Sequence, residues 1–358
     1  MFIRKIRQMV NIGLVSLVFV ILSGTHMVKA SQVPIDYESL NIMWELDIVG
    51  LNDLLPSNGY FIQNFSRYGS NIVFLSTYKN DDTYLVRCSL SGGTLIPLDY
   101  VVLSDYGHGE SVEITSFNST TNTYTIWLGT TARSTYQYWS TEIARIKYTV
   151  DSLADTGATF SDEKTITGIL NAALDSTTAV DQRSAVCVAE NDNRICFSTK
   201  NVDDDKWYYM IYSLSDINSV LDDNTTGSVA LSSLSTYRKS RFSLDTDTEL
   251  PFGSFQSEEI NGVGTGNKRL FLAGGRTNQN CGINQYLYTN GNYTTLEKEY
   301  IINTSVSPSD PNNTNGLYQA EMEGVKVYND SGQDYMYIMF RKKGTHSATF
   351  CKYAVATS

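Results

Sequence analysis

Proline, histidine and cysteine are scarce in this 358-residue chain, which contains 6, 3 and 5 of them. Only His108 and His346 lie beyond the first thirty residues, and the sequence has no H-E-x-x-H motif and no paired C-x-x-C motifs. The G-x-S-x-G elbow of hydrolases and the papain-type cysteine signature are absent as well. These absences exclude the common zinc and nucleophile motifs, so we expect no metal and no cofactor.

Basic residues are also few, since 27 Lys and Arg stand against 38 Asp and Glu and give a formal charge of −11. Nucleic acids bind surfaces with clustered Lys and Arg, and peptides that gather on anionic lipid are cationic. The charge therefore argues against nucleic acid as a partner and against a cationic membrane-binding peptide.

Long apolar runs are confined to the N-terminus. Basic residues Arg4, Lys5 and Arg7 precede an apolar stretch at 9–24, and a small-residue cleavage pattern ends at Ala30. The stretch of about sixteen residues is shorter than the roughly 20 that a spanning helix needs. We expect residues 1–30 to be a signal peptide cleaved after Ala30, leaving a secreted, extracellular chain 31–358 without a stable membrane span.

The odd number of cysteines argues against a complete disulfide framework. In CVAENDNRIC, a turn at Asn191 and Asp192 would place Cys187 opposite Cys196 in a hairpin. Opposed residues of a non-hydrogen-bonded pair are close enough for a disulfide. Two reduced, buried thiols fit the pattern equally well, and both states stay open.

Tyrosine, serine, threonine and asparagine are abundant, and short alternating runs bounded by Asn, Asp, Gly and Ser recur along the chain. Strong helical periodicity is rare, so the predicted fold class is all-β. The predicted strands form five groups of three: 60–65, 71–77 and 83–90; 111–117, 122–129 and 142–149; 184–189, 193–199 and 207–214; 258–263, 268–273 and 284–289; 321–328, 334–341 and 348–355.

A weak internal repeat links these groups. The pattern polar, any, polar, Gly or Ser, then small or β-branched recurs at 108–112, 181–185, 259–263 and 321–325, with a looser copy at 58–60. A small residue at a fixed place would let strands approach one another at a crowded centre. We predict a single-domain five-bladed β-propeller, while strands at similar intervals also suit a pair of β-sandwiches.

The predicted blades can be assigned to segments of the chain. They span approximately 58–105, 106–160, 180–235, 250–300 and 316–358. Segment 41–48 is an additional strand that would close the ring as the outer strand of the last blade. Segments 161–176 and 215–224 have short helical patterns and are expected to be surface connections.

Four stretches resemble, in order and spacing, the helveticin J family of large, heat-labile bacteriocins of lactic acid bacteria. They are GHGESVE (107–113), WSTEIARIKY (139–148), IYSLSDINSVLDD (211–223) and EMEGVKV (321–327). The resemblance runs from about residue 50 to the C-terminus. It implies a secreted protein that kills or inhibits related Gram-positive bacteria, a cell-envelope glycan or surface protein as its target, and an immunity protein as a further partner. It supplies no established catalytic residues.

Neighbouring acids in the repeat suggest two roles. In a glycoside hydrolase acting on wall polysaccharide, Glu321, Glu323 and Glu259 would supply the protonated acid and the ionised carboxylate that glycosidic cleavage needs. In a structural role, the same side chains would hydrogen-bond around a polar axis and fix the blades. We favour the second role, and the sequence leans against an enzyme.

The repeat positions together form the expected binding site. They are His108, Glu110, Asp181, Arg183, Glu259, Asn261, Glu321 and Glu323. Aromatic residues at loop ends could stack on sugar faces, namely Tyr106, Tyr136, Trp139, Trp207 and Tyr318. The expected function is that of a bacteriocin that recognises an envelope target through this site. A propeller glycosidase and a non-killing carbohydrate-binding or adhesion module are the alternatives.

Overall fold

The computed structural model describes residues 30–35, 40–56, 59–79, 81–151, 157–263, 267–275, 280–289, 291–303, 320–341 and 347–355. The chain divides into two units, Met1–Ser31 and Gln32–Ser358, and the architecture below is that of the second. Most of the expected signal peptide lies outside the described residues, as do Tyr318 and His346. Within the described part, no helix is both long and apolar enough to cross a membrane.

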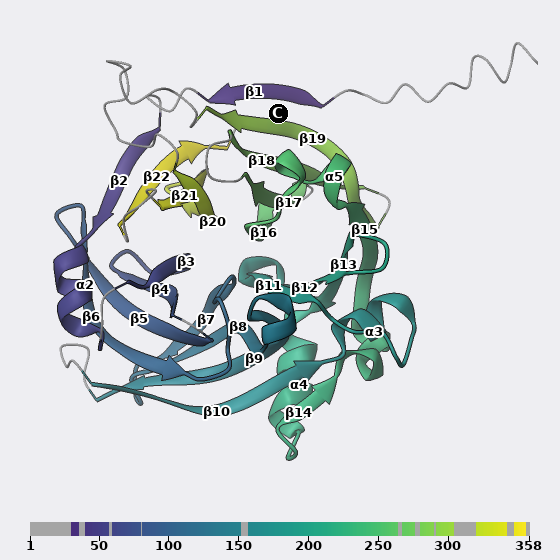
Figure 1. Ribbon diagram of the computed structural model, residues 1–358, viewed down its shortest axis with the longest axis horizontal. Helices are drawn as coiled ribbons and strands as arrows, with labels where there is room; N and C mark the ends of the chain where they lie inside the picture. The colour runs from purple at the N-terminus through teal and green to yellow at the C-terminus, as the bar shows by residue number, and fades with distance from the viewer. Residues whose placement is uncertain are drawn as a thin grey trace, which may run out of the picture. The chain divides into compact units, whose positions relative to one another are not determined.

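The unit is nearly all β, which confirms the predicted fold class, and its strands form antiparallel groups of four (Figure 1). The groups are β3 (Phe61–Tyr68), β4 (Ile72–Lys79), β5 (Asp82–Ser91) and β6 (Thr94–Leu103); β7 (Val112–Asn118), β8 (Thr123–Arg133), β9 (Trp139–Val150) and β10 (Ala158–Thr167); β11 (Arg183–Ala189), β12 (Arg194–Asn201), β13 (Lys206–Ser213) and β15 (Arg238–Asp245); β16 (Ser257–Val263), β17 (Asn267–Gly274), β18 (Cys281–Thr289) and β19 (Asn292–Ile302); and β20 (Glu321–Asp330), β21 (Gln333–Arg341), β22 (Ala348–Ala354) and β2 (Asn41–Leu46).

Two short strands and several helices complete the unit. Strand β1 (Ser31–Ile35) lies beside β19, and β14 (Ser228–Ala230) pairs in parallel with β10. The helices are α2 (Ile48–Leu54), α3 (Ile169–Leu174), α4 (Leu214–Asp223) and α5 (Thr246–Glu249), with 3-10 turns η2 (Ser134–Tyr136), η3 (Glu190–Asp192), η4 (Leu231–Tyr237) and η5 (Pro251–Gly253).

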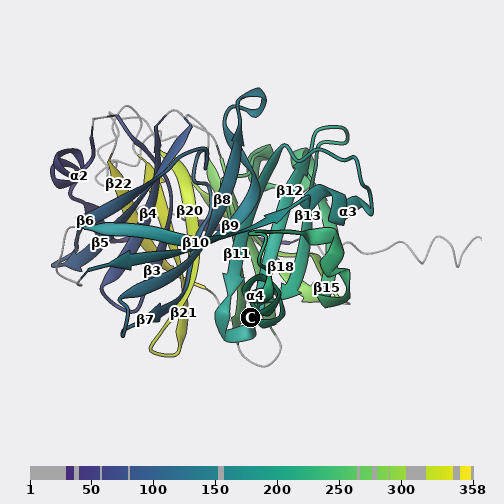
Figure 2. The same cartoon turned by 90° about the horizontal axis from the view of Figure 1, so that it is seen from below.

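The first strand of each group faces the centre of the ring (Figure 1). Strand β3 contacts β7 and β20, β11 contacts β7 and β16, and β16 contacts β20, so the contacts form a closed circuit. Figure 2 shows the groups standing side by side, with the β8–β9 hairpin projecting beyond its neighbours. The arrangement is propeller-like.

Strand β2 joins the two ends of the ring. It pairs antiparallel with β22, and Glu45 and Leu46 pair in parallel with Thr94 and Leu95 of β6. The first and last groups therefore form one eight-stranded sheet. Segment 41–48 thus lies beside the final strand, in the place that its expected closing role requires.

The hydrophobic core is divided among the gaps between neighbouring groups. Each of five buried apolar clusters combines side chains of two adjacent groups. Between the first and second groups, the ring of Phe74 packs edge-on against Tyr124 and Tyr148, at centroid distances of 5.1 and 4.9 Å. Such contacts fix the angle between neighbouring sheets.

Small residues do bring strands together at the centre. A Cβ atom at Gly324 of β20 would lie 3.0 Å from Cδ1 of Phe65 in β3. The hydroxyl of Ser257 in β16 accepts from the backbone N–H of Val325 and from the amide of Asn64, each at 3.3 Å. The repeat predicted that its Gly or Ser position lets inner strands approach one another closely. This is the case for Gly324 of β20.

Every predicted strand overlaps an observed one, but the fourth strands β6, β10, β15 and β19 were not predicted. The helical pattern at 215–224 is confirmed by α4, whose first turn is capped by the Ser213 hydroxyl. The helical interpretation of 161–176 is wrong over its first half, because β10 continues to Thr167 and only Ile169–Leu174 is helical. Pairing with β9 overrides the local pattern there.

Candidate functional site

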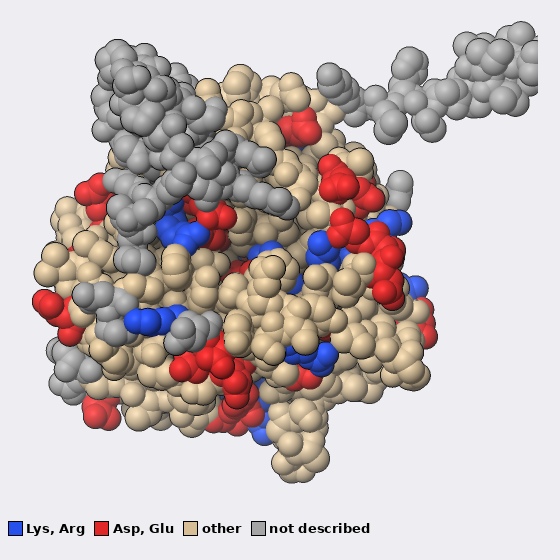
Figure 3. Space-filling view, in the orientation of Figure 1, with Lys and Arg blue, Asp and Glu red and all other residues tan. Residues whose placement is uncertain are grey.

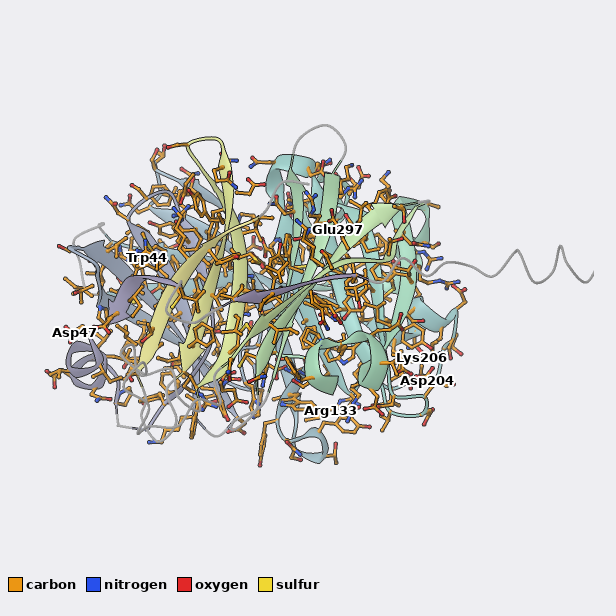
Figure 4. The ribbon with its side chains drawn as sticks, turned by 90° about the horizontal axis from the view of Figure 1, so that it is seen from above. Trp44, Asp47, Arg133, Asp204, Lys206 and Glu297 are labelled. Atoms are coloured by element: carbon orange, nitrogen blue, oxygen red, sulfur yellow. The ribbon has the colours of Figure 1, made fainter. Side chains whose placement is uncertain are left out.

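A cavity of about 500 Å³ opens at one end of the ring. It is lined by Gln63, Tyr78, His108, Glu110, Gln137, Trp139, Arg183, Lys200, Trp207, Thr246, Gly253, Ser254, Phe255, Gln256, Glu321, Glu323 and Arg341. In the space-filling view, basic and acidic side chains lie next to each other around the middle of this face (Figure 3). Figure 4 labels Arg133 at the end of β8, and Asp204 and Lys206 in the β12–β13 hairpin. All three lie toward one end of the ring.

The loop before β7 presents His108 and Glu110 to the cavity. Gly107 adopts a φ of 82°, and a Cβ atom there would lie 2.4 Å from the carbonyl oxygen of Tyr138, so only glycine fits. The hydroxyl of Thr83 donates to the Gly107 carbonyl at 2.6 Å, and that of Ser76 donates to the Gly109 carbonyl. The first group of strands therefore fixes the conformation of this loop.

Arg183 is the most enclosed cation of the cavity. Its Nε donates to Oε2 of Glu110 at 2.6 Å, and its Nη2 lies 2.6 Å from Oε1 of the same carboxylate. The guanidinium carbon lies over three rings, 4.3 Å from the centroid of Trp139, 5.1 Å from that of Phe255 and 5.6 Å from that of Trp207. This planar charge is held by a bidentate ion pair and by cation–π contacts at once.

A second ion pair of the lining lies at the start of β20. Nη2 of Arg341 donates to Oε2 of Glu321 at 2.6 Å, and the amide of Gln256 donates to Oε1 of Glu321 at 2.9 Å. Nε of Arg341 is 2.7 Å from Oε1 of Glu323 without the geometry of a hydrogen bond. Burial raises the pKa of Glu323 to about 8, although Arg341 opposes the shift. Burial therefore favours the protonated form of Glu323 at pH 7, although Arg341 lies beside it.

Two β-bulges aim side chains into the cavity. The β20–β21 register shifts between Met322 and Gly324, and the β3–β4 register shifts between Ile62 and Asn64. The intervening residues, Glu323 and Gln63, both line the cavity. A bulge changes the direction of a side chain without ending the strand, which explains how the inner strands contribute polar groups here.

His108 lies flat against Tyr78, with ring centroids 4.1 Å apart and an angle of 22° between the planes. Its ring also meets Trp139 edge-on at 6.4 Å. Burial and the charge of Arg183 lower the pKa of His108 to about 4. The imidazole is therefore neutral at pH 7 and adds an aromatic face and two polar nitrogens to the cavity.

Five of the eight residues expected at the binding site line this one cavity: His108, Glu110, Arg183, Glu321 and Glu323. The other three do not. Asp181 accepts from the backbone N–H of Leu170 at 2.7 Å and from the Thr199 hydroxyl at 3.0 Å, and so it caps the first turn of α3. Half-buried Asn261 stands opposite Arg269 near the far end of β16. The repeat predicted Asn261 at the cavity, but Gln256 lines the cavity instead.

Glu259 belongs to a separate buried cluster. Lys326 of β20 donates to Glu113 of β7 and to Glu259 of β16, the latter at 3.4 Å. Burial raises the pKa of Glu259 above its usual range, and Lys326 opposes the shift. This ion triad joins three inner strands, which is the structural role that we favoured for the acids of the repeat.

Of the aromatic residues expected to contact sugars, Trp139 and Trp207 line the cavity. Tyr106 is buried and Tyr136 is not part of the lining. Residues that the sequence did not single out include Arg341, Gln256, Lys200 and Phe255. One signal was available for Arg341, since the hairpin register places it directly opposite Glu321.

The hairpin register also places Cys187 of β11 opposite Cys196 of β12, as expected from the turn. Both side chains are fully buried and the sulfurs form separate thiols in the structure. Burial raises the pKa of each thiol. The thiols carry no bridge in this structure, and the choice between a disulfide and two reduced thiols stays a prediction for intact-mass measurement.

The sequence matches the family model described as bacteriocin helveticin-J over residues 66–352. This chain belongs to the helveticin J bacteriocin family. The match contains the GHGESVE loop, the β20 acids and Arg341, so the whole cavity lining apart from Gln63 falls within the region shared with the family. No curated protein matches the chain.

Among solved structures, a tail fibre of Staphylococcus aureus phage P68 is similar to this helveticin J family member, with a TM-score of 0.51 and 13% identity. The similarity covers 88% of this chain and 52% of the tail fibre, so the chain spans about half the length of that protein. A levansucrase from B. megaterium reaches a TM-score of 0.48 at 10% identity, over 91% of this chain and 89% of the enzyme. At 13% identity, the likeness to the tail fibre concerns the fold alone.

Proposed function

We propose that this protein is a secreted bacteriocin that recognises a carbohydrate of the Gram-positive cell envelope in its central cavity. The observation that carries the proposal is the lining itself, in which Trp139, Trp207 and Phe255 surround Arg183 of the Arg183–Glu110 ion pair. Sugars have apolar ring faces that stack on aromatic side chains and hydroxyl groups that bond to carboxylates, guanidinium groups and amides. Family membership supports the antibacterial part of the proposal.

The charge of the lining favours a sugar over a strongly charged ligand. Arg183 is paired with Glu110, and Arg341 is paired with Glu321. Burial keeps Glu323 protonated and His108 neutral at pH 7. The paired charges leave many hydrogen-bonding groups but little net field, which suits a ligand rich in hydroxyl groups.

We also propose that the ring has five blades of four strands each. The closed circuit of contacts among β3, β7, β11, β16 and β20 supports this count, as does the same strand order within each group. Two β-sandwiches would have no reason to join these inner strands in one circuit.

Export by a signal peptide cleaved after Ala30 is part of the same proposal. Residue Ser31 begins β1, so a chain cut at this point keeps its first strand. The N-terminus of the protein recovered from culture medium tests the cleavage. A start at Ser31 supports it, and a retained Met1 contradicts it.

Killing is tested by adding the mature chain, 31–358, to a panel of lactic acid bacteria and following viability together with entry of a membrane-impermeant dye. Loss of viability in at least one strain supports the bacteriocin proposal. Prompt dye entry would identify membrane damage as the mechanism, and killing without dye entry would identify the wall or metabolism. Wall binding with full viability across the panel would instead favour an adhesion module.

One observation favours a second function, glycoside hydrolysis. Glu323 is a buried, protonated carboxylic acid that lines a cavity close to other carboxylates, and such an acid can donate a proton to a leaving oxygen. Release of reducing sugar from purified cell walls, lost in Glu323→Gln, would establish this activity. No release by the wild-type chain would reject it.

A further inference from the structure

A second group of reactive side chains lies away from the cavity, between the third and fourth groups of strands. Cys187 of β11 and Cys196 of β12 face Glu258 of β16, and the two sulfurs and a carboxylate oxygen lie within 4.8 Å of one another. The exposed fractions of the three residues are 0%, 0% and 2%. The function proposed above uses none of them.

Several polar atoms around this group lack a hydrogen-bond partner among the described residues. Both carboxylate oxygens of Glu258 are in this position, and so are the hydroxyl oxygens of Ser198 and Tyr209. The Ser198 hydroxyl and the Cys187 thiol lie within hydrogen-bonding range of the Glu258 side chain and act to lower its pKa, but burial outweighs them and raises it to about 8. None of the four atoms has a hydrogen bond of good geometry. Poorly satisfied buried polar groups are uncommon in native proteins, and four of them beside two thiols point to a ligand.

We propose that Cys187, Cys196 and Glu258 bind a thiophilic divalent cation, with Zn²⁺ as the expected metal. Two thiolates and one carboxylate are a donor set that suits Zn²⁺, which takes four ligands in structural sites. A fourth position remains for an oxygen donor. A disulfide between the two cysteines would remove the Cys187 thiol as a donor to Glu258 and leave the Ser198 hydroxyl, whereas a metal ion satisfies all three side chains.

The charge around the site is compatible with the metal. Three anionic ligands around a doubly charged cation leave one negative charge, and the ammonium group of Lys326 is near enough to lower the pKa of Glu258. Binding would release the protons of both thiols and of Glu258, so affinity rises with pH. Because the site is fully buried, the ion would enter during folding and would join the third group of strands to the fourth.

The test uses the mature chain, reduced, unfolded in urea and refolded with one equivalent of Co²⁺ as a spectroscopic substitute for Zn²⁺. The proposal predicts a thiolate-to-cobalt charge-transfer band in the near ultraviolet, displacement of Co²⁺ by Zn²⁺, and about one metal ion per chain after gel filtration. In Cys187→Ser and Cys196→Ser the band should fall at least tenfold. Cys88→Ser, which removes a buried thiol outside the group, should retain the full band.

Glu258→Gln keeps the shape of the side chain and tests the third ligand if a cysteine variant fails to fold. The proposal predicts at least a tenfold weaker Zn²⁺ affinity in competition with a chelator and an altered visible cobalt spectrum. A wild-type chain that refolds without binding Co²⁺ overturns the proposal. A native protein with no metal and a mass lower by two hydrogens than its reduced form overturns it too, because the cysteines are then oxidised to a disulfide.

Discussion

At the scale of single residues, the centre of the ring is defined by buried charged groups that lie beside partners of opposite sign. Two such groups are present, and every side chain in them is less than a tenth exposed. They are Glu110 with Arg183, and Glu113 and Glu259 with Lys326. Removing one partner of such a pair leaves the other charge buried without compensation. Loss of either partner of these pairs is therefore expected to destabilise the ring.

Glu323 should make stability depend on pH. Its pKa is raised to about 8 in the folded protein, while an unfolded Glu loses its proton near pH 4.3. Between these values the folded chain holds a proton that the unfolded chain has lost, so stability falls as pH rises through this window. In Glu323→Gln this part of the decline should vanish, at most about 1.4 kcal/mol for each pH unit.

The measurement is urea unfolding of both proteins between pH 5 and 9. Glu299→Gln, a change in β19 outside the cavity lining, is the control and should keep the wild-type dependence. Curves for the wild type and Glu323→Gln that run parallel over the whole range would contradict a protonated Glu323.

Part of the site could be predicted from the sequence, because the internal repeat marks the start of the inner strands. Glu110, Arg183 and Glu323 lie near the start of an inner strand, where the repeat placed them. The copy in the fourth group was placed too far along β16, so Asn261 was expected at the cavity, where Gln256 lies. Gln256 comes from a loop and Arg341 from a second strand, and contacts of this kind depend on the closed ring.

At the scale of strands and helices, the outer strands are the elements that the sequence pattern did not predict. Strand β6 contains Pro97 and the buried charge Asp99, and neither fits an alternating apolar strand. Its pairing with β5 bulges next to Pro97, between Arg87 and Cys88. Outer strands of this kind are held by their neighbours, so a window of sequence carries little sign of them.

Asp99 should be a major determinant of stability. It accepts two hydrogen bonds from Nε of Arg87, each at 3.1 Å, and one from the hydroxyl of Tyr148 in β9. Both members of the ion pair are completely buried. Asp99→Asn should lower the free energy of unfolding by about 3–5 kcal/mol, because the guanidinium group loses its counter-charge.

An exposed pair supplies the control for Asp99. Asp205 pairs with Lys200, but its side chain is 55% exposed, and Asp205→Asn should change the free energy of unfolding by no more than about 1 kcal/mol. Urea titration measures both. Equal losses in the two variants would contradict the structural role of the Arg87–Asp99 pair.

Strand β2 should be required for ring closure. Trp44, labelled in Figure 4, is 3% exposed. It packs against Tyr337 and Phe350 at centroid distances of 5.2 and 5.8 Å. Trp44→Ala should reduce the free energy of unfolding by about 3–5 kcal/mol, since a large cavity is left at the junction. Val49→Ala, at a position that is 66% exposed, is the matched control. A loss below 1 kcal/mol for Trp44→Ala would show that β2 is dispensable.

At the scale of the whole molecule, the ring brings distant segments of the chain to one cavity. The lining combines the loop before β7, the end of the β8–β9 hairpin, the turn after α5 and the strands β20 and β21. The chain belongs to the helveticin J bacteriocin family, and we propose that an envelope carbohydrate binds in this cavity.

Binding of the mature chain to solubilised wall glycan of a sensitive strain, measured by calorimetry, tests this claim most directly. Trp139→Ala removes a ring from the cavity, whereas Tyr138→Ala removes its neighbour, which is 40% exposed and not part of the lining. We predict that Trp139→Ala weakens binding by about tenfold or more, equivalent to about 1.4 kcal/mol, and that Tyr138→Ala leaves it unchanged. Equal affinity of the wild type and Trp139→Ala for the glycan would contradict the account.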